Sequence, residues 1–495
     1  MTVTLLTSAC LTRRVSTDDC HPEQSEGSFI MNINRNILKL AVPSILANIT
    51  VPLVGMVDIA IAGHLDASAA TMIGGITIGS MLFDLLYWNF GFLRVGTGGL
   101  AAQAYGRGDR RECARILARA MGISLAIALV LLAIQWFVVQ AAFWVVECTP
   151  QVRELASEYF LIRIWAAPAT LSLMALKGWF IGMQDSVSAM VADITVNGVN
   201  ILMSFILALG LTIGGNEVVL GMGFIGVAAG TVAAQWTGLV VSLIIIYFKY
   251  HKNTMSMLEM NDIRGLFKGD QTRRFFVMNA NLFVRSLCFI GIYIGFTVIS
   301  ARYGDTLLAV SSIMMKLLMI FSYFTDGFAY AGEALVGRYV GARDRVMLGQ
   351  SVKWTFVWSM GLAVLFMGIY HWAGVPMLRM MTSDATVIQA AGAYLPWLLL
   401  MPPVGCAAFT WDGVFIGATA SKGLRNSMLW AVVAFVIVWG AGVLGLEWVT
   451  EKQTIAPEWY DSMSIHILMA AYFAHLLART IYLSLKARRD VFSAI

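Results

Sequence analysis

Long, nearly uninterrupted apolar segments recur along this chain of 495 residues, and they constrain its fold more than any other feature. Hydrophobic residues make up 59% of the sequence and charged residues only 13%, whereas soluble domains are about a quarter charged. A bilayer-spanning helix needs about 20 apolar residues, and hydropathy predicts about twelve such spans. They are expected at 37–63, 69–104, 112–140, 153–183, 187–213, 222–249, 274–300, 306–340, 347–373, 385–417, 424–447 and 463–486. We therefore predict an all-α polytopic membrane protein.

A polar stretch at 251–273 divides the predicted spans into two groups of about six. An even number of spans in each group gives both groups the same orientation, related by an axis along the membrane normal. We expect a disordered leader at 1–32, upstream of a functional start at Met31. The remaining divisions are a first lobe at 33–250, a cytoplasmic linker at 251–273, a second lobe at 274–489 and a tail at 490–495.

Two pairs of short motifs indicate that the lobes are internal repeats. AYGRGD ends at Asp109 and YVGARD at Asp344, while LKGWFIG and WDGVFIG carry Gly178 and Gly413 at the same place. Both pairs are 235 positions apart. Chance similarity between glycine-rich turns is the alternative, but two motifs at one offset favour a repeat.

Basic residues in short loops set the orientation of membrane proteins. With the N-terminus in the cytoplasm, the inner loops hold most of the basic clusters, including those at 107–115, 249–274, 338–345 and 422–425. The last outer loop is acidic, with Glu447, Glu451, Glu458 and Asp461. We therefore predict a multi-pass inner-membrane protein with both termini in the cytoplasm.

Signatures of other functional classes are missing from the sequence. It has no Gly-x-x-x-x-Gly-Lys-Ser/Thr, no Gly-x-Ser-x-Gly, and no histidine pair at metal-binding spacing. Its six cysteines are scattered, and nothing indicates nucleic-acid binding. We expect no enzyme activity, no organic cofactor and no metal, and a monomer whose partners are the lipid bilayer and small amphipathic molecules.

The first span contains one acid, Asp58, and two prolines, Pro43 and Pro52. A carboxylate in hydrocarbon is costly and is a candidate functional group. Asp58 lies about 30 Å of helix from the inner end of its span, in the outer half of the membrane. The prediction is that it faces a cavity and takes up and releases a proton. The alternative is an interfacial acid that touches water.

A polar stripe follows the fifth span. Asp193, Asn197, Asn200 and Ser204 are spaced four, three and four residues apart, which places them on one helical face. The stripe is expected to face the protein interior, where it would bind substrate, proton or water, or else form an interhelical hydrogen-bond seam.

The second lobe has its own charges inside predicted spans. Asp326 and Glu333 are seven residues apart on the eighth span, with Lys316 before them, and Asp412 occupies the repeat position of Lys177. Because unpaired charges at mid-bilayer are costly, we expect pairings across helices, such as Lys316 with Asp412 or Glu333.

Several longer motifs are familiar: AVPS at 41–44, VDIAIAGHLD at 57–66, FLRVGTGGLAAQAYGRGD at 92–109, GWFIGMQDS at 178–186, GVAAGTVAAQW at 226–236, DGFAYAGEALVGRYVGARD at 326–344 and DGVFIGATAS at 412–421. Through these motifs the chain, over about residues 33–489, resembles the MATE (multidrug and toxic compound extrusion) transporters, and within them the DinF-like branch.

The resemblance implies two pseudo-symmetric six-helix lobes around a V-shaped central cavity. It also implies export of amphipathic, often cationic compounds in exchange for H⁺, with Na⁺ as the alternative coupling ion. Asp58 matches the aspartate implicated in proton coupling, and Pro43 the proline where bending of the first helix is proposed. Asn200 and Thr231 match polar residues of that aspartate's network.

One position departs from the family pattern. Where some members have a second aspartate four residues after the asparagine, this chain has Ser204. Asp58 is therefore expected to act alone, or with Asp193 or Asn197. The second-lobe sodium-site aspartate of another branch falls near Gly405, so it is not carried over.

Two other functions remain open at this point. A lipid-linked precursor flippase of the same superfamily would need a cationic central cavity, for which Arg94, Lys177, Arg285 and Lys316 are candidates. A non-transporting receptor or an intramembrane enzyme would lack an explanation for the repeat.

Overall fold

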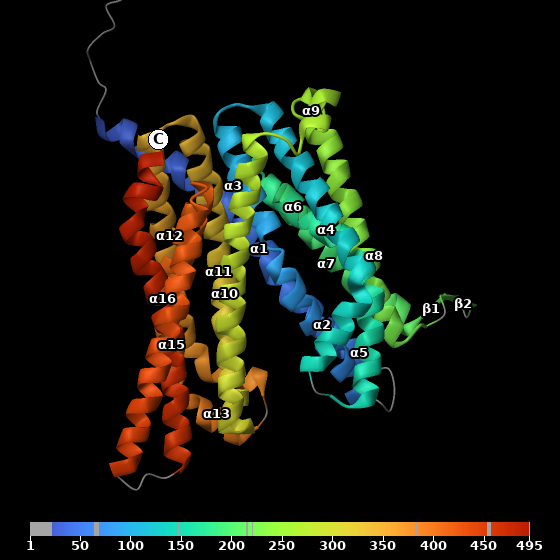
Figure 1. Cartoon of the computed structure of the whole chain (residues 1–495), viewed down its shortest axis with the longest axis vertical. Coiled ribbons are helices and arrows are strands. Elements are labelled where there is room, and N and C mark those ends of the chain that lie inside the picture. Colours follow the sequence, from blue (N-terminus) through green and yellow to red (C-terminus); the bar gives the residue numbers. More distant parts are fainter. Residues whose placement is uncertain are drawn as a thin grey trace, which may run out of the picture.

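The computed structural model describes residues 22–63, 69–146, 148–213, 216–219, 221–382, 384–452 and 457–494 (Figure 1). Its helices are α1 (Pro22–Gly63), α2 (Ala69–Asn89), α3 (Phe92–Gly106), α4 (Arg110–Val145), α5 (Pro150–Arg163), α6 (Ala167–Gly182), α7 (Ser186–Leu209), α8 (Phe224–Ile245), α9 (Met260–Gly265), α10 (Asp270–Ser300), α11 (Asp305–Ala342), α12 (Arg345–Met381), α13 (Ala385–Gly392), α14 (Leu395–Gly417), α15 (Ser421–Lys452) and α16 (Pro457–Asp490). Five shorter helical turns accompany them: η1 (Ile164–Ala166), η2 (Ile246–Tyr250), η3 (Met255–Met257), η4 (Ala301–Tyr303) and η5 (Phe492–Ala494).

The prediction of twelve spans is confirmed, because twelve helical segments among the described residues are long and apolar enough to cross a membrane. The second span is interrupted between α2 and α3, and the fourth is α5 and α6 joined by the turn η1. The fifth ends earlier than expected, at Leu209, where Gly210 adopts φ 84° and stops the helix. The antiparallel strands β1 (Leu211–Ile213) and β2 (Asn216–Val219) follow. Residues 211–213 therefore form a strand, whereas the prediction included them in the helical span.

The leader and the linker also differ from expectation. Residues 22–32, predicted as part of a disordered leader, belong to α1; a helix can continue beyond the membrane because its backbone hydrogen bonds are internal. Residues 1–21 lie outside the described residues. The linker at 251–273 contains η3 and α9, and α10 begins within it at Asp270.

The repeat is visible in the backbone geometry. Gln184 (φ 64°) and Thr419 (φ 56°), 235 positions apart, both take the left-handed conformation that ends a helix. The two motif aspartates play one role, since Asp109 accepts a hydrogen bond from the Glu112 amide and Asp344 from the Met347 amide. Each caps the helix that follows.

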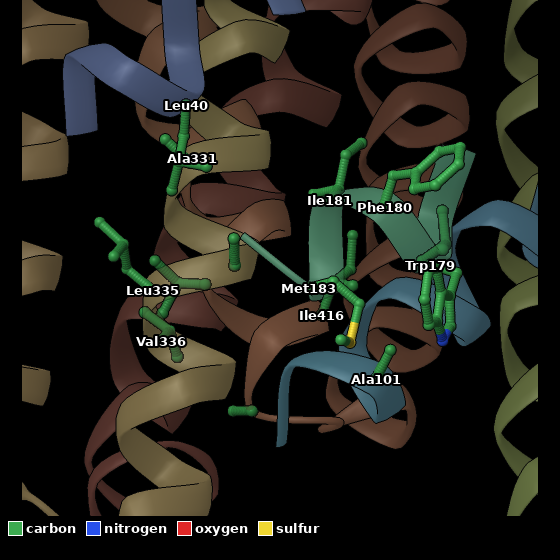
Figure 2. Close-up of a cluster of buried hydrophobic side chains, with 14 of the residues drawn as sticks. Leu40, Ala101, Trp179, Phe180, Ile181, Met183, Ala331, Leu335, Val336 and Ile416 are labelled. Carbon is green, nitrogen blue, oxygen red and sulfur yellow. The ribbon is translucent and has the colours of Figure 1, made fainter. Parts of the chain in front are cut away.

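The hydrophobic cores show how the lobes meet. One cluster is confined to the first lobe and includes Ile61 and Phe160, and another is confined to the second lobe and includes Phe321 and Ile465. A third is shared, with side chains from α1, α3, α6, α11 and α14 (Figure 2). The lobes therefore pack together at the end that holds the described chain termini and keep separate cores at the other end (Figure 1). This is the predicted V shape.

Glycines allow the helices to touch at the shared end. A Cβ at Gly106 of α3 would lie 1.9 Å from the Arg338 carbonyl oxygen of α11, and one at Gly341 of α11 would lie 2.1 Å from the Gln103 carbonyl oxygen of α3. The repeat relates these two contacts, because Gly106 and Gly341 are 235 positions apart and so are Gln103 and Arg338. Within each lobe, Gly178 and Gly413 make the corresponding pair, each 2.1 Å from a carbonyl oxygen of the neighbouring helix. The inter-helix contact is thus backbone against backbone.

Substitution of Gly106 or Gly341 by Ala should therefore weaken the junction by about 1–3 kcal/mol, because the added methyl group meets a carbonyl oxygen that only a helix shift can move. The melting temperature of the purified protein measures this. Gly349→Ala is the control, since no atom lies within 4 Å of a Cβ there. Its melting temperature should be unchanged or higher. Equal effects at all three glycines would contradict the backbone-contact argument.

The linker is fastened to α4 by arginine side chains, two of which bind the same carboxylate. Asp262 of α9 accepts hydrogen bonds from Arg111 (2.8 Å) and Arg115 (2.5 Å), and Arg119 donates to the Leu266 carbonyl at 2.8 Å. The bonds from Arg111 and Arg115 hold the pKa of Asp262 below its ordinary value. The lowered pKa means that this stabilisation is complete above about pH 4 and decreases as the pH falls further.

Asp262→Asn should release the linker at neutral pH, seen as several-fold faster amide hydrogen exchange over 255–268 with the helical spans unaffected. Glu259→Gln is the control, since Glu259 also pairs with Arg111 but its side chain is 65% exposed. Exposed pairs contribute little. Unchanged exchange in Asp262→Asn would show that the linker is held by other contacts.

Candidate functional site

Asp58 lies inside the first lobe, on α1. Its side chain is 6% exposed, and its Oδ1 atom is buried without a hydrogen-bond partner in the described structure. The carboxyl interacts with the Ser204 hydroxyl of α7 and lies in the electrostatic field of Arg163. The alternative of an interfacial acid in contact with water is therefore wrong. A buried polar atom without a partner is costly and points to a functional role.

The polar stripe of α7 forms an interhelical seam. Asn197 donates to the Thr50 hydroxyl of α1 at 2.5 Å, and Asn200 donates to the Thr231 hydroxyl of α8 at 2.9 Å. Ser204 donates weakly to Asn200 and to the Val227 carbonyl. The stripe faces the interior, as expected. It joins α7 to α1, the helix that carries Asp58, and to α8.

Asp193 is occupied elsewhere. It pairs with Lys177 of α6 at 2.6 Å. Eleven residues of α7 separate it from Ser204, which corresponds to about 16 Å along the helix. The structure therefore does not bring Asp193 to Asp58, and the option that these two acids act together is not supported.

Pro43 and Pro52 both lie within α1, which continues through them from Pro22 to Gly63. Proline removes one backbone hydrogen bond and favours a bend. Ser44, next to Pro43, donates its hydroxyl to the Leu40 carbonyl at 2.9 Å. The role of Pro43 in bending stays a prediction.

Glu333 forms an ion pair between the lobes. Its side chain is fully buried on α11, and Arg94 of α3 donates to its Oε2 atom at 3.2 Å. Arg94 also lies 4.4 Å from the centre of the Tyr330 ring. Gly98 makes room for the carboxylate, because a Cβ there would lie 2.0 Å from Oε1. This buried pair thus joins the two halves next to the glycine contacts.

Asp412 of α14 shares one oxygen between two arginines, Arg285 of α10 and Arg479 of α16. The Arg479 side chain is 1% exposed. The predicted pairing of Lys316 with Asp412 or Glu333 is wrong, because arginines already occupy both acids. Lys316 is exposed, and 17 residues of α11 place it about 25 Å from Glu333. Asp326 is half-buried and makes no ion pair within the described part of the chain.

Sequence reasoning missed Arg163. This residue of α5 donates to Tyr159 (3.1 Å) and Ser80 (3.3 Å), and its guanidinium lies 4.9 Å from the Phe83 ring centre. Its charge acts on both Asp58 and Asp84. The signal was available, because an arginine within the apolar segment 153–183 is as costly as the acids that were singled out. Arg479 was missed for the same reason.

Outside the spans, Asp185 has a structural role between α6 and α7. It accepts hydrogen bonds from Lys249 at 2.7 Å and from Tyr250 at 2.6 Å, and it caps α7 through the Ser188 amide. Burial alone would raise the pKa of this carboxyl, but the bonds from Lys249, Ser188 and Tyr250 outweigh it and keep the pKa below its ordinary value. Among the described residues, no group of three or more His, Cys, Asp or Glu side chains could hold a metal ion.

Comparison with known proteins agrees with this architecture. The MatE family model matches residues 43–206 and 282–441, one segment in each lobe. The chain is 32% identical over 426 residues to the DNA damage-inducible protein F of Escherichia coli (strain K12). The aligned region covers 85% of this chain and 88% of the relative. The chain is 24% identical over 437 residues to a probable multidrug resistance protein NorM of Photorhabdus laumondii, covering 86% and 91%.

Solved structures share the fold. An outward-facing multidrug resistance MATE family transporter of the MOP superfamily superimposes with a TM-score of 0.77 at 15% identity, over 93% of this chain and 96% of the other. A MOP superfamily transporter from Pyrococcus furiosus gives 0.76 over the same shares. The twelve spans, the two lobes and the match of the family model to both of them lead to one conclusion: this chain belongs to the MatE family of multidrug and toxic compound extrusion transporters.

Proposed function

We propose that this transporter exports amphipathic, often cationic small molecules in exchange for protons, and that Asp58 is the group that couples the two. The observation that carries the proposal is the burial of the Asp58 carboxyl with one oxygen unpartnered, beside the α7–α8 seam. Such a carboxyl is subject to opposed influences, because burial disfavours its charge while a guanidinium and a hydroxyl favour it. A change in either influence therefore makes the Asp58 carboxyl take up or release a proton.

Substrate and proton then compete for the first lobe. When Asp58 is ionised, a cationic substrate supplies the positive charge that the buried carboxylate lacks. When it is protonated, that attraction is lost. Each ligand shifts the inward–outward equilibrium only by the difference between its affinities for the two states. Arg163, whose charge acts on Asp58, is placed to tune this competition.

The glycine junction, the contact that Gly106 and Gly341 make between α3 and α11, serves as the inner gate in this proposal. It adjoins the basic loops at 107–111 and 343–345, which the orientation proposal places in the cytoplasm together with both termini. The lobes are packed at that end and have separate cores at the other, which supports an outward-facing state. Opening inward requires α3 and α11 to separate, and the Arg94–Glu333 pair must then break.

Three observations bear on the flippase alternative. Of the four cations that supported it, Arg94, Lys177 and Arg285 are already paired with acids. Only Lys316 makes no ion pair within the described part of the chain. A strongly cationic cavity for a pyrophosphate group is therefore less well supported than a mixed one.

Asp58→Asn should abolish proton-driven export, because the amide cannot exchange a proton. Dye efflux from vesicles holding the purified protein, driven in turn by a pH gradient and by a Na⁺ gradient, measures this. Glu458→Gln, an exposed acid in the first turn of α16, is the control and should transport normally. Unchanged pH-driven export in Asp58→Asn would refute the role of Asp58, and loss of Na⁺-driven export alone would replace H⁺ by Na⁺.

A double-mutant cycle tests the gate. Arg94→Gln or Glu333→Gln alone leaves a buried charge without its partner, which costs about 3–5 kcal/mol. Each single variant should therefore separate α3 from α11, measured as the distance between spin labels on these helices. The double variant Arg94→Gln/Glu333→Gln should restore much of the closed population. Additive effects of the two substitutions would mean that the pair does not hold the lobes together.

A further inference from the structure

A cavity of about 1160 Å³ lies beside the glycine junction, away from Asp58. The first lobe contributes the C-terminal part of α3 and the first turns of α4 to its wall, and the second lobe contributes α10, the start of α15 and the end of α16. All these segments meet at the end of the molecule where the described chain terminates (Figure 1). The cavity thus spans both lobes at the level where membrane helices begin and end.

Its rim carries an excess of positive charge. Four cations on the rim make no ion pair within the described part of the chain: Arg107, Arg273, Arg274 and Lys422. The acids are mostly engaged. Asp109 caps α4, Glu112 lies 3.8 Å from Arg119, and Asp490 pairs with Arg489 at 2.7 Å. Asp109 and Asp270 have no cation within ion-pair distance in the described structure, so four unpaired cations stand against two such acids. The open charges therefore favour an anion.

Apolar side chains form the deeper part of the wall. Leu100 lies about two turns of α3 from Arg107, and Met278 lies about one turn of α10 from Arg274, in each case further from the end of the molecule where the described chain terminates. Val277, beside Met278, is 46% exposed. A charged rim above an apolar floor matches a molecule with an anionic head group and a hydrocarbon tail, since basic residues at the membrane surface attract anionic lipid.

The pseudo-symmetric position has less of this character. The corresponding cavity, between α1, the start of α7, η2 and α11, is about 500 Å³, and its cations are Lys39, Lys249 and Arg338. There Lys249 is neutralised by Asp185 at 2.7 Å, and Arg338 lies over the Tyr105 and Tyr339 rings. Lys39 and Arg338 make no ion pair within the described part of the chain, so the smaller cavity has two open cations and the larger has four.

We propose that the larger cavity binds a phosphate-bearing amphiphile, such as an anionic phospholipid, with its phosphate on Arg273, Arg274 and Lys422 and its chains on the apolar floor. Because both lobes line the site, a bound lipid stabilises the arrangement in which the lobes are closed at this end. The lipid therefore acts as a regulator of the transport cycle and not as cargo. The inference goes beyond the proposed function and rests on it only for the side of the membrane concerned.

The test uses the purified full chain and phosphatidylglycerol, with phosphatidylcholine as the neutral comparison. Binding is measured by native mass spectrometry and by the shift in melting temperature. Phosphatidylglycerol should bind at least tenfold more tightly than phosphatidylcholine and raise the melting temperature. The triple variant Arg273→Gln/Arg274→Gln/Lys422→Gln should lose both effects. The matched control Lys39→Gln/Lys252→Gln/Arg264→Gln removes three exposed cations elsewhere and should retain them.

Three further arms make the outcome decisive. Inorganic phosphate should bind weakly in comparison with phosphatidylglycerol; equal affinity would overturn the assignment to an amphiphile. Equal loss of binding in the two triple variants would overturn the site, and Lys422→Gln alone keeps the test available where the triple variant does not fold. Asp58→Asn should bind phosphatidylglycerol normally, so failure of the coupling proposal and failure of this one are distinguishable. Gly106→Ala, which weakens the junction, should reduce the affinity.

Discussion

Inside a membrane every polar group must find its partner within the protein, because hydrocarbon offers none. This constraint explains the main features of the structure. The spans are helices, which satisfy their own backbone. The residues beside the interruption between α2 and α3 contact α10, Trp88 through Phe289 and Phe92 through Phe283. Several charges in the spans are paired, including Arg94 with Glu333 and Lys177 with Asp193. Glu333, Asp412 and Asp58 each have one buried oxygen without a hydrogen-bond partner in the described structure. Asp58 differs from the other two because it makes no ion pair within the described part of the chain, whereas arginines pair with both of them.

The two lobes share a backbone plan and differ in chemistry. Gly178 and Gly413 make the same helix contact in each lobe, yet the residues just before them, Lys177 and Asp412, have opposite charges. Lys177 takes an acid from the next helix, whereas Asp412 takes two arginines from distant ones. The two lobes thus share their packing surfaces, while the charges of their polar interiors and the partners of those charges differ.

Much of the fold could be predicted from sequence because its signals are local or periodic. Hydropathy gave the spans, and the 235-residue offset gave the two lobes. The pairing of charges could not be predicted, since it depends on how helices distant in the sequence cross. Lys316 shares a helix with Glu333, but its distance along that helix excludes contact, and the true partner, Arg94, comes from the other lobe. Asp58 was found because it is the one acid of its span, whereas Arg163 was overlooked although it obeys the same rule.

The pair of reciprocal contacts made by Gly106 and Gly341 has a consequence for how the molecule moves. Two bare backbones pressed together attract strongly at contact and hardly at all once a small gap opens, because dispersion forces fall off steeply with distance. Long interlocking side chains would instead resist separation over several ångströms. Parting here should cost most of its energy at the very start, so that the halves are either seated or free, with little population between.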